Sequence, residues 1–167
     1  FVGVLDEDYI MVDVDDMNEA QLLLNIIEDE QIKCNILETD NGMHFYFKGY
    51  NMTNNKTKNF SAIGIMCDYK LGIKNSCDPL KINGEFRKWL KRVDETEIDE
   101  LPKWLEASFK TDPGFTELAE GDGRNQTLFN YILKLQQIAM SKEEIRNTIR
   151  LINKHVLFEP ISDKELD

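Results

Sequence analysis

The first part of the chain contains an apolar run followed by a helical pattern. Residues 9–15 are mainly apolar and end in carboxylates, which is typical of a strand that stops at an acidic turn. Residues 18–30 place apolar side chains three and four positions apart, which predicts an amphipathic helix. Asp16, with Glu19 three residues later, resembles a capping box at the helix start. The pattern therefore predicts a strand, a tight turn and a helix.

Short apolar segments that we expect to be strands follow this helix. They are residues 34–39, 43–48, 61–66, 68–73, 79–82 and 85–90. Two Asn-Gly pairs, Asn41–Gly42 and Asn83–Gly84, supply the positive φ that tight hairpin turns require. Residues 51–59 are rich in asparagine and are expected to form a surface loop. This half of the chain should therefore be a sheet with one flanking helix.

The second half of the chain becomes acidic and then helical. Residues 93–122 carry ten acidic and two basic side chains and are expected to form a linker. Helices are predicted over residues 124–139 and 141–155, and Ser141 with Glu144 forms a capping box at the second. We expect an α+β protein with a sheet domain over 1–92, an acidic linker over 93–122 and a small helical domain over 123–167.

Both ends of the sequence predict a piece of a longer protein. The chain opens directly on an apolar run, residues 1–5, with no initiating methionine. Ser162 and Glu165 form a further capping box just before the last residue. A third helix is therefore expected to begin there and to be truncated.

The composition is that of a folded domain in a reducing compartment. The chain has 167 residues and is 41% hydrophobic, which is enough for a core. Its three cysteines, Cys34, Cys67 and Cys77, fit no zinc-ligand or disulfide spacing, which favours the cytoplasm. Neither a membrane-spanning apolar stretch nor a signal peptide is evident. No membrane association is expected.

The net charge of −11 argues against a nucleic-acid partner, because binding to phosphates relies on Lys and Arg. Residues 61–92 are an exception, with seven basic and three acidic side chains. The basic residues are Lys70, Lys74, Lys81, Arg87, Lys88, Lys91 and Arg92. This block is compatible either with phosphate binding or with a solvated basic edge strand.

Three aspartates are candidate metal ligands. Asp13 and Asp15 lie two apart on the first long strand, so they point to the same side, about 6–7 Å apart at Cα. Such a pair suits Mg²⁺ or Mn²⁺, and Asp68, after another apolar run, could complete a site for two metals. The alternative is an acidic strand end that only caps the following helix.

His44 is the candidate histidine. It lies within a strand, on the face opposite Met43, Phe45 and Phe47, where a structural role is the common alternative. His155 lies near the end of a helix, where a positive charge is favourable without any function. His44 is therefore the residue to consider with the aspartates.

The joint order of these features resembles the archaeo-eukaryotic primase superfamily, and in particular the primase-polymerase domain of replication proteins from phages and plasmids of Gram-positive hosts. The matching residues are Val12, Asp13, Val14 and Asp15; then Gly42, Met43 and His44 with the aromatic run after them; then Cys67, Asp68, Tyr69 and Lys70 with Gly72. Residues 121–125 and 128–131 resemble the small helical domain that follows the catalytic domain in such primases. The likeness covers nearly the whole chain.

The resemblance implies an RRM-like antiparallel or mixed sheet with a flanking helix as the primase catalytic core, followed by the small helical domain. By it, Asp13, Asp15 and Asp68 would be catalytic ligands of Mg²⁺ or Mn²⁺, and His44 would bind the phosphates of the incoming nucleotide. Lys70 is a plausible phosphate partner, and Lys74 and Ser76 are further candidates for nucleotide binding. Only twelve residues precede Asp13, which is short for the family, so a front part is expected to be missing.

The function implied is metal-dependent, template-directed nucleotidyl transfer by a DNA primase or polymerase, in phage or mobile-element replication inside a bacterial cell. Its partners would be nucleoside triphosphates, a single-stranded DNA template or primer, and a helicase region of the same natural polypeptide. These residues contain no phosphate-binding loop of a helicase. One alternative is a non-catalytic primase-fold module that binds single-stranded DNA or a replication partner. Another is a metal-dependent nuclease with Tyr46 as its nucleophile.

Overall fold

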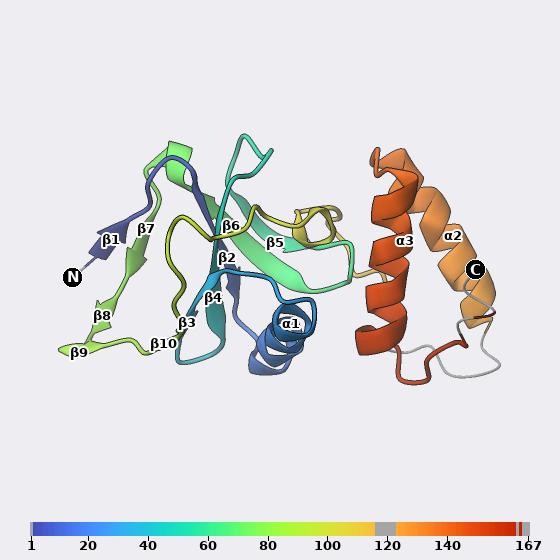
Figure 1. The fold of residues 1–167 in the computed structure, drawn as a ribbon, viewed down its shortest axis with the longest axis horizontal. Helices are drawn as coiled ribbons and strands as arrows, with labels where there is room; N and C mark the ends of the chain where they lie inside the picture. The colour runs from blue at the N-terminus through green and yellow to red at the C-terminus, as the bar shows by residue number, and fades with distance from the viewer. Residues whose placement is uncertain (1, 116–122, 163, 165–167) are drawn as a thin grey trace.

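A computed structural model describes residues 2–115, 123–162 and 164 (Figure 1). These residues form a six-stranded antiparallel sheet, two separate strand pairs and three α-helices. The expected α+β class is therefore confirmed. In this part of the chain, no helix is both long enough and apolar enough to cross a membrane.

The six-stranded sheet is the centre of the fold. Its strands, in spatial order, are β10 (Trp89–Lys91), β3 (Asn35–Glu38), β4 (Met43–Lys48), β2 (Tyr9–Val14), β6 (Met66–Leu71) and β5 (Lys56–Phe60). Every neighbouring pair is antiparallel. β2 therefore lies between two partners and places its side chains over the middle of the sheet.

Helix α1 (Met17–Asp29) covers one face of the sheet. Its N-terminus is capped as predicted, because the Glu19 backbone N–H donates to the Asp16 carboxylate over 2.9 Å. The buried residues of α1 join the alternate residues of β2 in the main core: Ala20, Leu23, Ile26 and Ile27 with Ile10, Val12 and Val14. The opposite face of β2 is thus left for other side chains.

That opposite face of the sheet carries a small apolar cluster and a second layer. Met11, Leu37 and Tyr46 form the cluster. Over it lie β1 (Val2–Val4) paired with β7 (Cys77–Pro79), and then a hairpin of β8 (Lys81–Ile82) and β9 (Glu85–Phe86). The hairpin turns with φ of 49° at Asn83 and 86° at Gly84, which confirms the prediction for this Asn-Gly pair.

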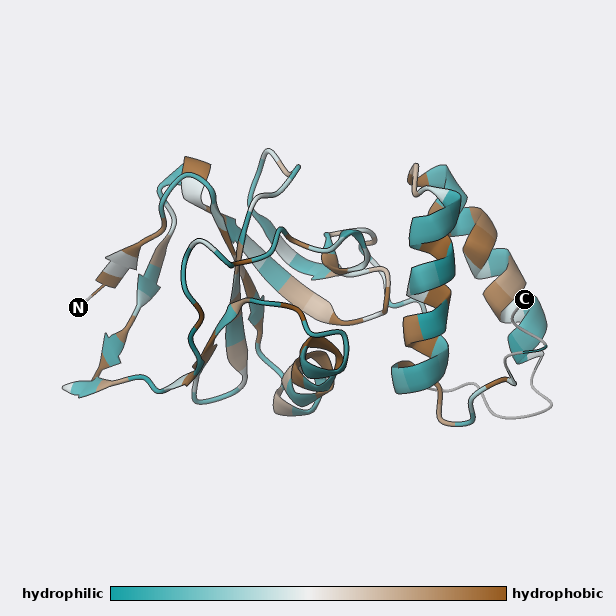
Figure 2. Ribbon diagram, in the orientation of Figure 1, coloured by the Kyte–Doolittle hydropathy of each residue, from teal (hydrophilic) through white to brown (hydrophobic). Residues whose placement is uncertain are grey.

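The C-terminal part is helical, as predicted. α2 (Arg124–Gln137) is followed by α3 (Lys142–Leu151), which continues into a π-helical turn, Ile152–Val156. Ser141 and Glu144 form the expected reciprocal capping box. Figure 2 shows alternating hydrophilic and hydrophobic bands along α3. Its apolar side chains are therefore available to the main core, which contains Ile145 and Ile149.

The acidic segment contributes apolar residues to the main core. The members in the main core are Leu101, Trp104, Leu105 and Phe115, two of them in a 3₁₀ turn at Lys103–Leu105, and Ile98 is buried outside that cluster. The Tyr131 hydroxyl of α2 donates to the carbonyl of Ala62 over 2.6 Å, which ties the helices to the turn beside β6. The division of the chain into a catalytic core, a linker and a helical domain stays a prediction.

Two predictions from the sequence concern residues outside the described part of the chain. The proposed third helix depends on Glu165, and the glycine-rich start of the helical domain depends on Gly121 and Asp122. Both stay predictions.

Two local predictions around residue 60 are wrong. Residues 51–59 are not loop throughout, because Lys56–Phe60 forms the edge strand β5, whose polar side chains suit an edge that faces water. Residues 61–66 are largely a turn instead of a strand. There the Gly64 backbone N–H donates to the Ser61 carbonyl over 3.0 Å, with φ of 86° at Gly64.

Gly42 has a different role from the one predicted. Neither Asn41 nor Gly42 adopts a positive φ. A Cβ on Gly42 would lie 1.8 Å from the carbonyl oxygen of Val14, so this glycine allows the β3–β4 turn to approach the end of β2.

Gly42→Ala is therefore expected to destabilise the protein by about 3 kcal/mol, because backbone atoms must move to admit the methyl group. Gly84→Ala is the matched control, since its Cβ would meet nothing within 4 Å and only the left-handed conformation is penalised, by about 1 kcal/mol. Urea unfolding of both variants measures the difference. Equal losses at the two glycines would contradict this role.

Candidate functional site

The predicted site residues meet on the sheet face opposite α1. Asp13 on β2 lies directly opposite His44 on β4 and directly opposite Asp68 on β6. The three strands are neighbours in the order β4, β2 and β6, so one row across the sheet carries an imidazole, a carboxylate and a second carboxylate. The strand register explains why residues that are far apart in the sequence converge here.

His44 is held between two carboxylates. Its Nε2 lies 3.2 Å from Oδ1 of Asp13, and its Nδ1 lies 2.9 Å from Oδ2 of Asp78. Burial disfavours the charged imidazole, but the two carboxylates outweigh burial and raise the pKa of His44 to about 9. His44 is thus a fixed cation at neutral pH.

Asp78 is the residue that sequence reasoning missed. It lies on β7 and is only 2% exposed, yet its carboxylate contacts three polar side chains, two on β4 and one just after β9. The Tyr46 hydroxyl donates to Oδ2, the atom that also faces His44, while Arg87 Nη1 lies 3.3 Å from Oδ1. The available signal was an acidic residue inside the basic block.

Lys70 supplies a second positive charge. It lies on β6 opposite Met11, and its ammonium nitrogen is 3.8 Å from Oδ2 of Asp13. Burial opposes ionisation of Asp13, yet the attraction of His44 and Lys70 prevails and lowers the pKa of the Asp13 carboxyl. About a third of the Lys70 side chain is exposed, so it can still meet a ligand from solvent.

Asp15 and Asp68 form the acidic, open end of the site. Asp15 is exposed just after β2, and partial burial together with the charges of Asp13 and Asp68 raises its pKa. Oδ1 of Asp68 accepts the backbone N–H of Lys58 over 2.7 Å, at an irregularity in β5. Among the described residues, neither Asp15 nor Asp68 has a basic partner within ion-pair distance.

The two weaker nucleotide-binding candidates lie apart from this row of residues. Lys74 is exposed in a 3₁₀ turn, Gly72–Lys74, that follows β6. Ser76 is buried, and its hydroxyl accepts a hydrogen bond from the Asn55 amide over 3.2 Å. Neither side chain has a recorded contact with Asp13 or His44, and their roles in nucleotide binding stay predictions.

Carboxylate oxygens that could bind a divalent cation are present, although they do not form one coordination site. No three His, Cys, Asp or Glu side chains in the described part of the chain are grouped as a metal site. However, Oδ1 of Asp13 is buried without a hydrogen bond, since His44 is at ion-pair distance but not aligned with it. This oxygen and the carboxylates of Asp15 and Asp68 are the hard ligands that Mg²⁺ and Mn²⁺ prefer.

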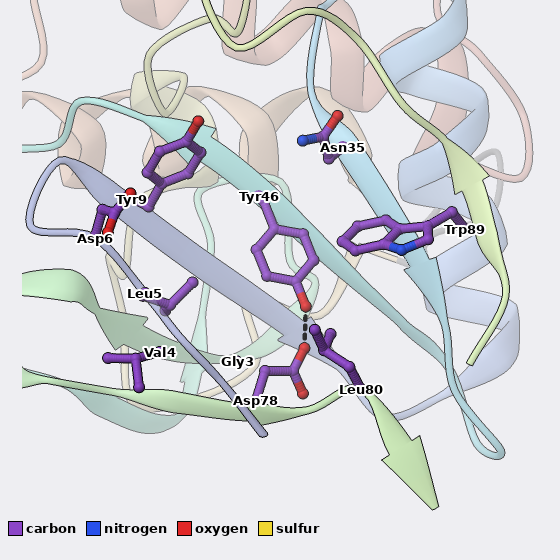
Figure 3. Close-up of a pocket in the computed structure, with 10 residues that line it drawn as sticks. All are labelled: Gly3, Val4, Leu5, Asp6, Tyr9, Asn35, Tyr46, Asp78, Leu80 and Trp89. Atoms are coloured by element: carbon purple, nitrogen blue, oxygen red, sulfur yellow. Dashed lines mark hydrogen bonds between the residues drawn. The ribbon is translucent and has the colours of Figure 1, made fainter. Parts of the chain in front are cut away.

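A cavity of about 220 Å³ lies beside this site, between the sheet and the β1 layer (Figure 3). Asp78 and Tyr46 line it and separate it from His44, which is not among its lining residues. Figure 3 shows the rings of Tyr46 and Trp89 side by side on one wall and Leu5 on the opposite side. The two ring centroids are 5.5 Å apart. The cavity therefore has an aromatic wall, and it shares the Asp78 carboxylate with the charged site.

The stability of the protein is expected to fall as the pH rises from about 6.5 to about 9. The pKa of His44 is higher in the folded protein than in the unfolded chain. The contribution of His44 to the free energy of unfolding is therefore complete below about pH 6.5, and it is lost as the pH rises through about 9. The loss is on the order of 3 kcal/mol. Urea unfolding across this pH range measures the loss. His44→Gln is expected to abolish the dependence of the free energy of unfolding on pH, and His155→Gln is expected to retain it.

The arrangement joins two charge environments on one sheet face. Lys70, which is partly exposed, can meet a phosphate of a ligand directly. His44 is buried with both ring nitrogens facing carboxylates, so it must exchange its contact with Asp13 to reach a phosphate. The carboxylates of Asp15 and Asp68 can meet a metal ion. Tyr46 is only 5% exposed, and burial together with the bond to Asp78 raises its pKa, so it is poorly suited to act as a nucleophile. In comparisons with known proteins, this chain matches no protein-family model, no curated protein and no solved structure.

Proposed function

We propose that this chain is a metal-dependent, template-directed nucleotidyltransferase, a DNA primase or polymerase that acts in phage or mobile-element replication. The observation that carries the proposal is the row of Asp13, His44 and Asp68 on three adjacent strands. This row agrees with the residues that resemble the archaeo-eukaryotic primase superfamily. The antiparallel sheet with its flanking helix supports the same proposal.

The phosphate-binding role falls to His44 and Lys70. Phosphoryl transfer requires charge neutralisation and alignment more than an activated side chain. His44 is held as a cation by Asp13 and Asp78, and its Nε2 would turn from Asp13 to a phosphate when Asp13 binds the metal. Lys70 is more exposed and adjusts to the position of the triphosphate. Together they would hold the incoming nucleotide against the sheet.

The carboxylates would hold the metal and set the direction of attack. Asp13, Asp15 and Asp68 are the residues that would bind Mg²⁺ or Mn²⁺. The bound cation supplies neutralisation of charge at the attacking and leaving oxygens. In the reaction, the primer 3′-oxygen forms a bond to the α-phosphorus, the bond between the α-phosphorus and its bridging oxygen breaks, and pyrophosphate leaves. The hydroxyl proton passes to solvent.

The direct test uses the purified chain on a primed single-stranded DNA template. We expect incorporation of nucleotides in the presence of Mn²⁺ or Mg²⁺, and calorimetric binding of a nucleoside triphosphate that disappears in EDTA. Absence of both incorporation and metal-dependent nucleotide binding would overturn the proposal. Cleavage of labelled DNA without any nucleotide would indicate a nuclease instead.

A non-catalytic primase-fold module is the second candidate, and one observation favours it. Asp13 is already neutralised by His44 and Lys70, and the described carboxylates form no metal-binding group. Under this alternative the charged residues stabilise the fold. It predicts single-stranded DNA or protein binding with no calorimetric response to a nucleoside triphosphate.

A further inference from the structure

The β8–β9 hairpin, together with the segment that follows it up to Arg92, carries positive charge and aromatic surface on an acidic protein. Residues 81–92 contain five basic side chains and a single acidic one, Glu85, whereas the chain as a whole has a net charge of −11. In Figure 1 the hairpin projects at the end of the molecule that is opposite the C-terminal helices. Phe86 is 67% exposed there. This segment therefore places a largely exposed aromatic ring beside several cations.

Two of the cations lie against aromatic rings. The Lys81 ammonium is 5.0 Å from the centroid of the Phe86 ring, and the Arg92 guanidinium is 4.5 Å from that of Trp89. Lys88, between these pairs, is exposed. The positive charges of Lys81, Lys88 and Arg92 are therefore displayed along one short segment.

The cavity beside the candidate site lies at the base of this hairpin. Leu80, which lines the cavity, immediately precedes β8, and its carbonyl accepts the Arg87 backbone N–H over 2.9 Å. Trp89 lines the same cavity, and the Arg92 guanidinium lies over its ring. Asn35 also lines the cavity. Its Oδ1 accepts the Val93 backbone N–H, so its side-chain Nδ2 is the group that could donate to a ligand in the cavity.

We propose that the β8–β9 hairpin and the cavity at its base bind single-stranded nucleic acid. Lys81, Lys88 and Arg92 contact the phosphates, Phe86 stacks on one base, and a second base enters the cavity against Trp89. The cavity of about 220 Å³ has room for one base. The aromatic wall and the Asn35 amide suit the face and the edge of such a base.

The hairpin is also anchored to the candidate catalytic row. Arg87 Nη1 donates to the Pro79 carbonyl over 2.9 Å and contacts Asp78, which in turn holds His44. The segment that would bind the strand is therefore connected to His44 through Asp78. The identification of this strand as the template rests on the proposed function, whereas the binding itself does not.

Fluorescence anisotropy of a labelled oligothymidylate, without nucleotide or metal, tests the proposal. We expect the double variant Lys88→Glu/Arg92→Glu to weaken binding at least about tenfold and to reduce the slope of log K against log salt by about 1.4, because two phosphate contacts are lost. Phe86→Ala should weaken it about fivefold or more. Lys142→Glu and Phe158→Ala are matched controls on the exposed helical part and should bind as the wild type does.

Three results would overturn the proposal: wild-type affinity in the double variant, an equal loss in the controls, or equal affinity for a duplex. Quenching of tryptophan fluorescence by the oligonucleotide should disappear in Trp89→Phe, and persistent quenching would overturn the assignment of a base to the cavity. The double variant should keep metal-dependent nucleotide binding. If the wild-type protein binds the oligonucleotide but no nucleoside triphosphate, the result overturns the proposed function and leaves the proposed strand-binding surface standing.

Discussion

Asp13→Asn is expected to lower kcat/KM for nucleotide incorporation by at least about 10³-fold. The substitution preserves the volume of the side chain but removes the buried charge that pairs with His44 and Lys70. It also replaces one of the two carboxylate oxygens, which we assign to the metal, by an amide nitrogen that binds no cation. Loss of one preorganised electrostatic group alone is worth about 10²–10³-fold, and the loss of metal binding adds to it. Incorporation on a primed template measures the effect.

Asp16→Asn is the matched control for this variant. Asp16 lies three residues further along and only caps α1, and asparagine caps a helix as well as aspartate does. It should keep wild-type activity. Wild-type kinetics in Asp13→Asn would show that the carboxylate has no part in the reaction, and an equal loss in Asp16→Asn would point to a general effect on the fold.

Asp78→Ala is expected to destabilise the protein by about 3–5 kcal/mol. The substitution leaves the His44 imidazolium, the Tyr46 hydroxyl and the Arg87 guanidinium without their shared acceptor in a buried site. The pKa of His44 should also fall, because one of the two carboxylates that raise it is gone. Urea unfolding measures the first effect, and NMR titration of the imidazole in the milder Asp78→Asn measures the second.

Asp40→Ala provides the comparison, because Asp40 is exposed in the turn between β3 and β4. A change within about 0.5 kcal/mol is expected there. If Asp78→Ala were as mild as Asp40→Ala, the network around His44 would contribute little to the fold. An unchanged pKa of His44 in Asp78→Asn would mean that Asp13 alone keeps the imidazole charged.

Elements with strong local signals were predictable from the sequence. The strand at Tyr9–Val14, α1 and α3 combine periodic apolar residues with capping residues, so local energetics and core packing favour the same structure. β5 was missed because an edge strand has few apolar side chains to reveal it. The role of Gly42 was misjudged, because the close approach of Val14 is a tertiary contact.

The site was predictable only in part. Asp13, His44 and Lys70 were named from strand alternation and the resemblance, and the antiparallel register does bring them together. Asp78 was not named, since β7 belongs to a second layer, and no periodic pattern links it to the main sheet. Its importance arises from burial and from the groups that converge on it.

The sequence by itself determined which residues could carry charge chemistry, because side-chain type and the two-residue period of a strand follow directly from it. It also determined the caps of α1 and α3 and the basic segment of residues 81–92. Only the tertiary structure decided which charges are buried together. Strand register and the β1–β7 layer place Asp13 and Asp78 on the two sides of His44, and the electrostatic consequence depends on distances of a few ångströms.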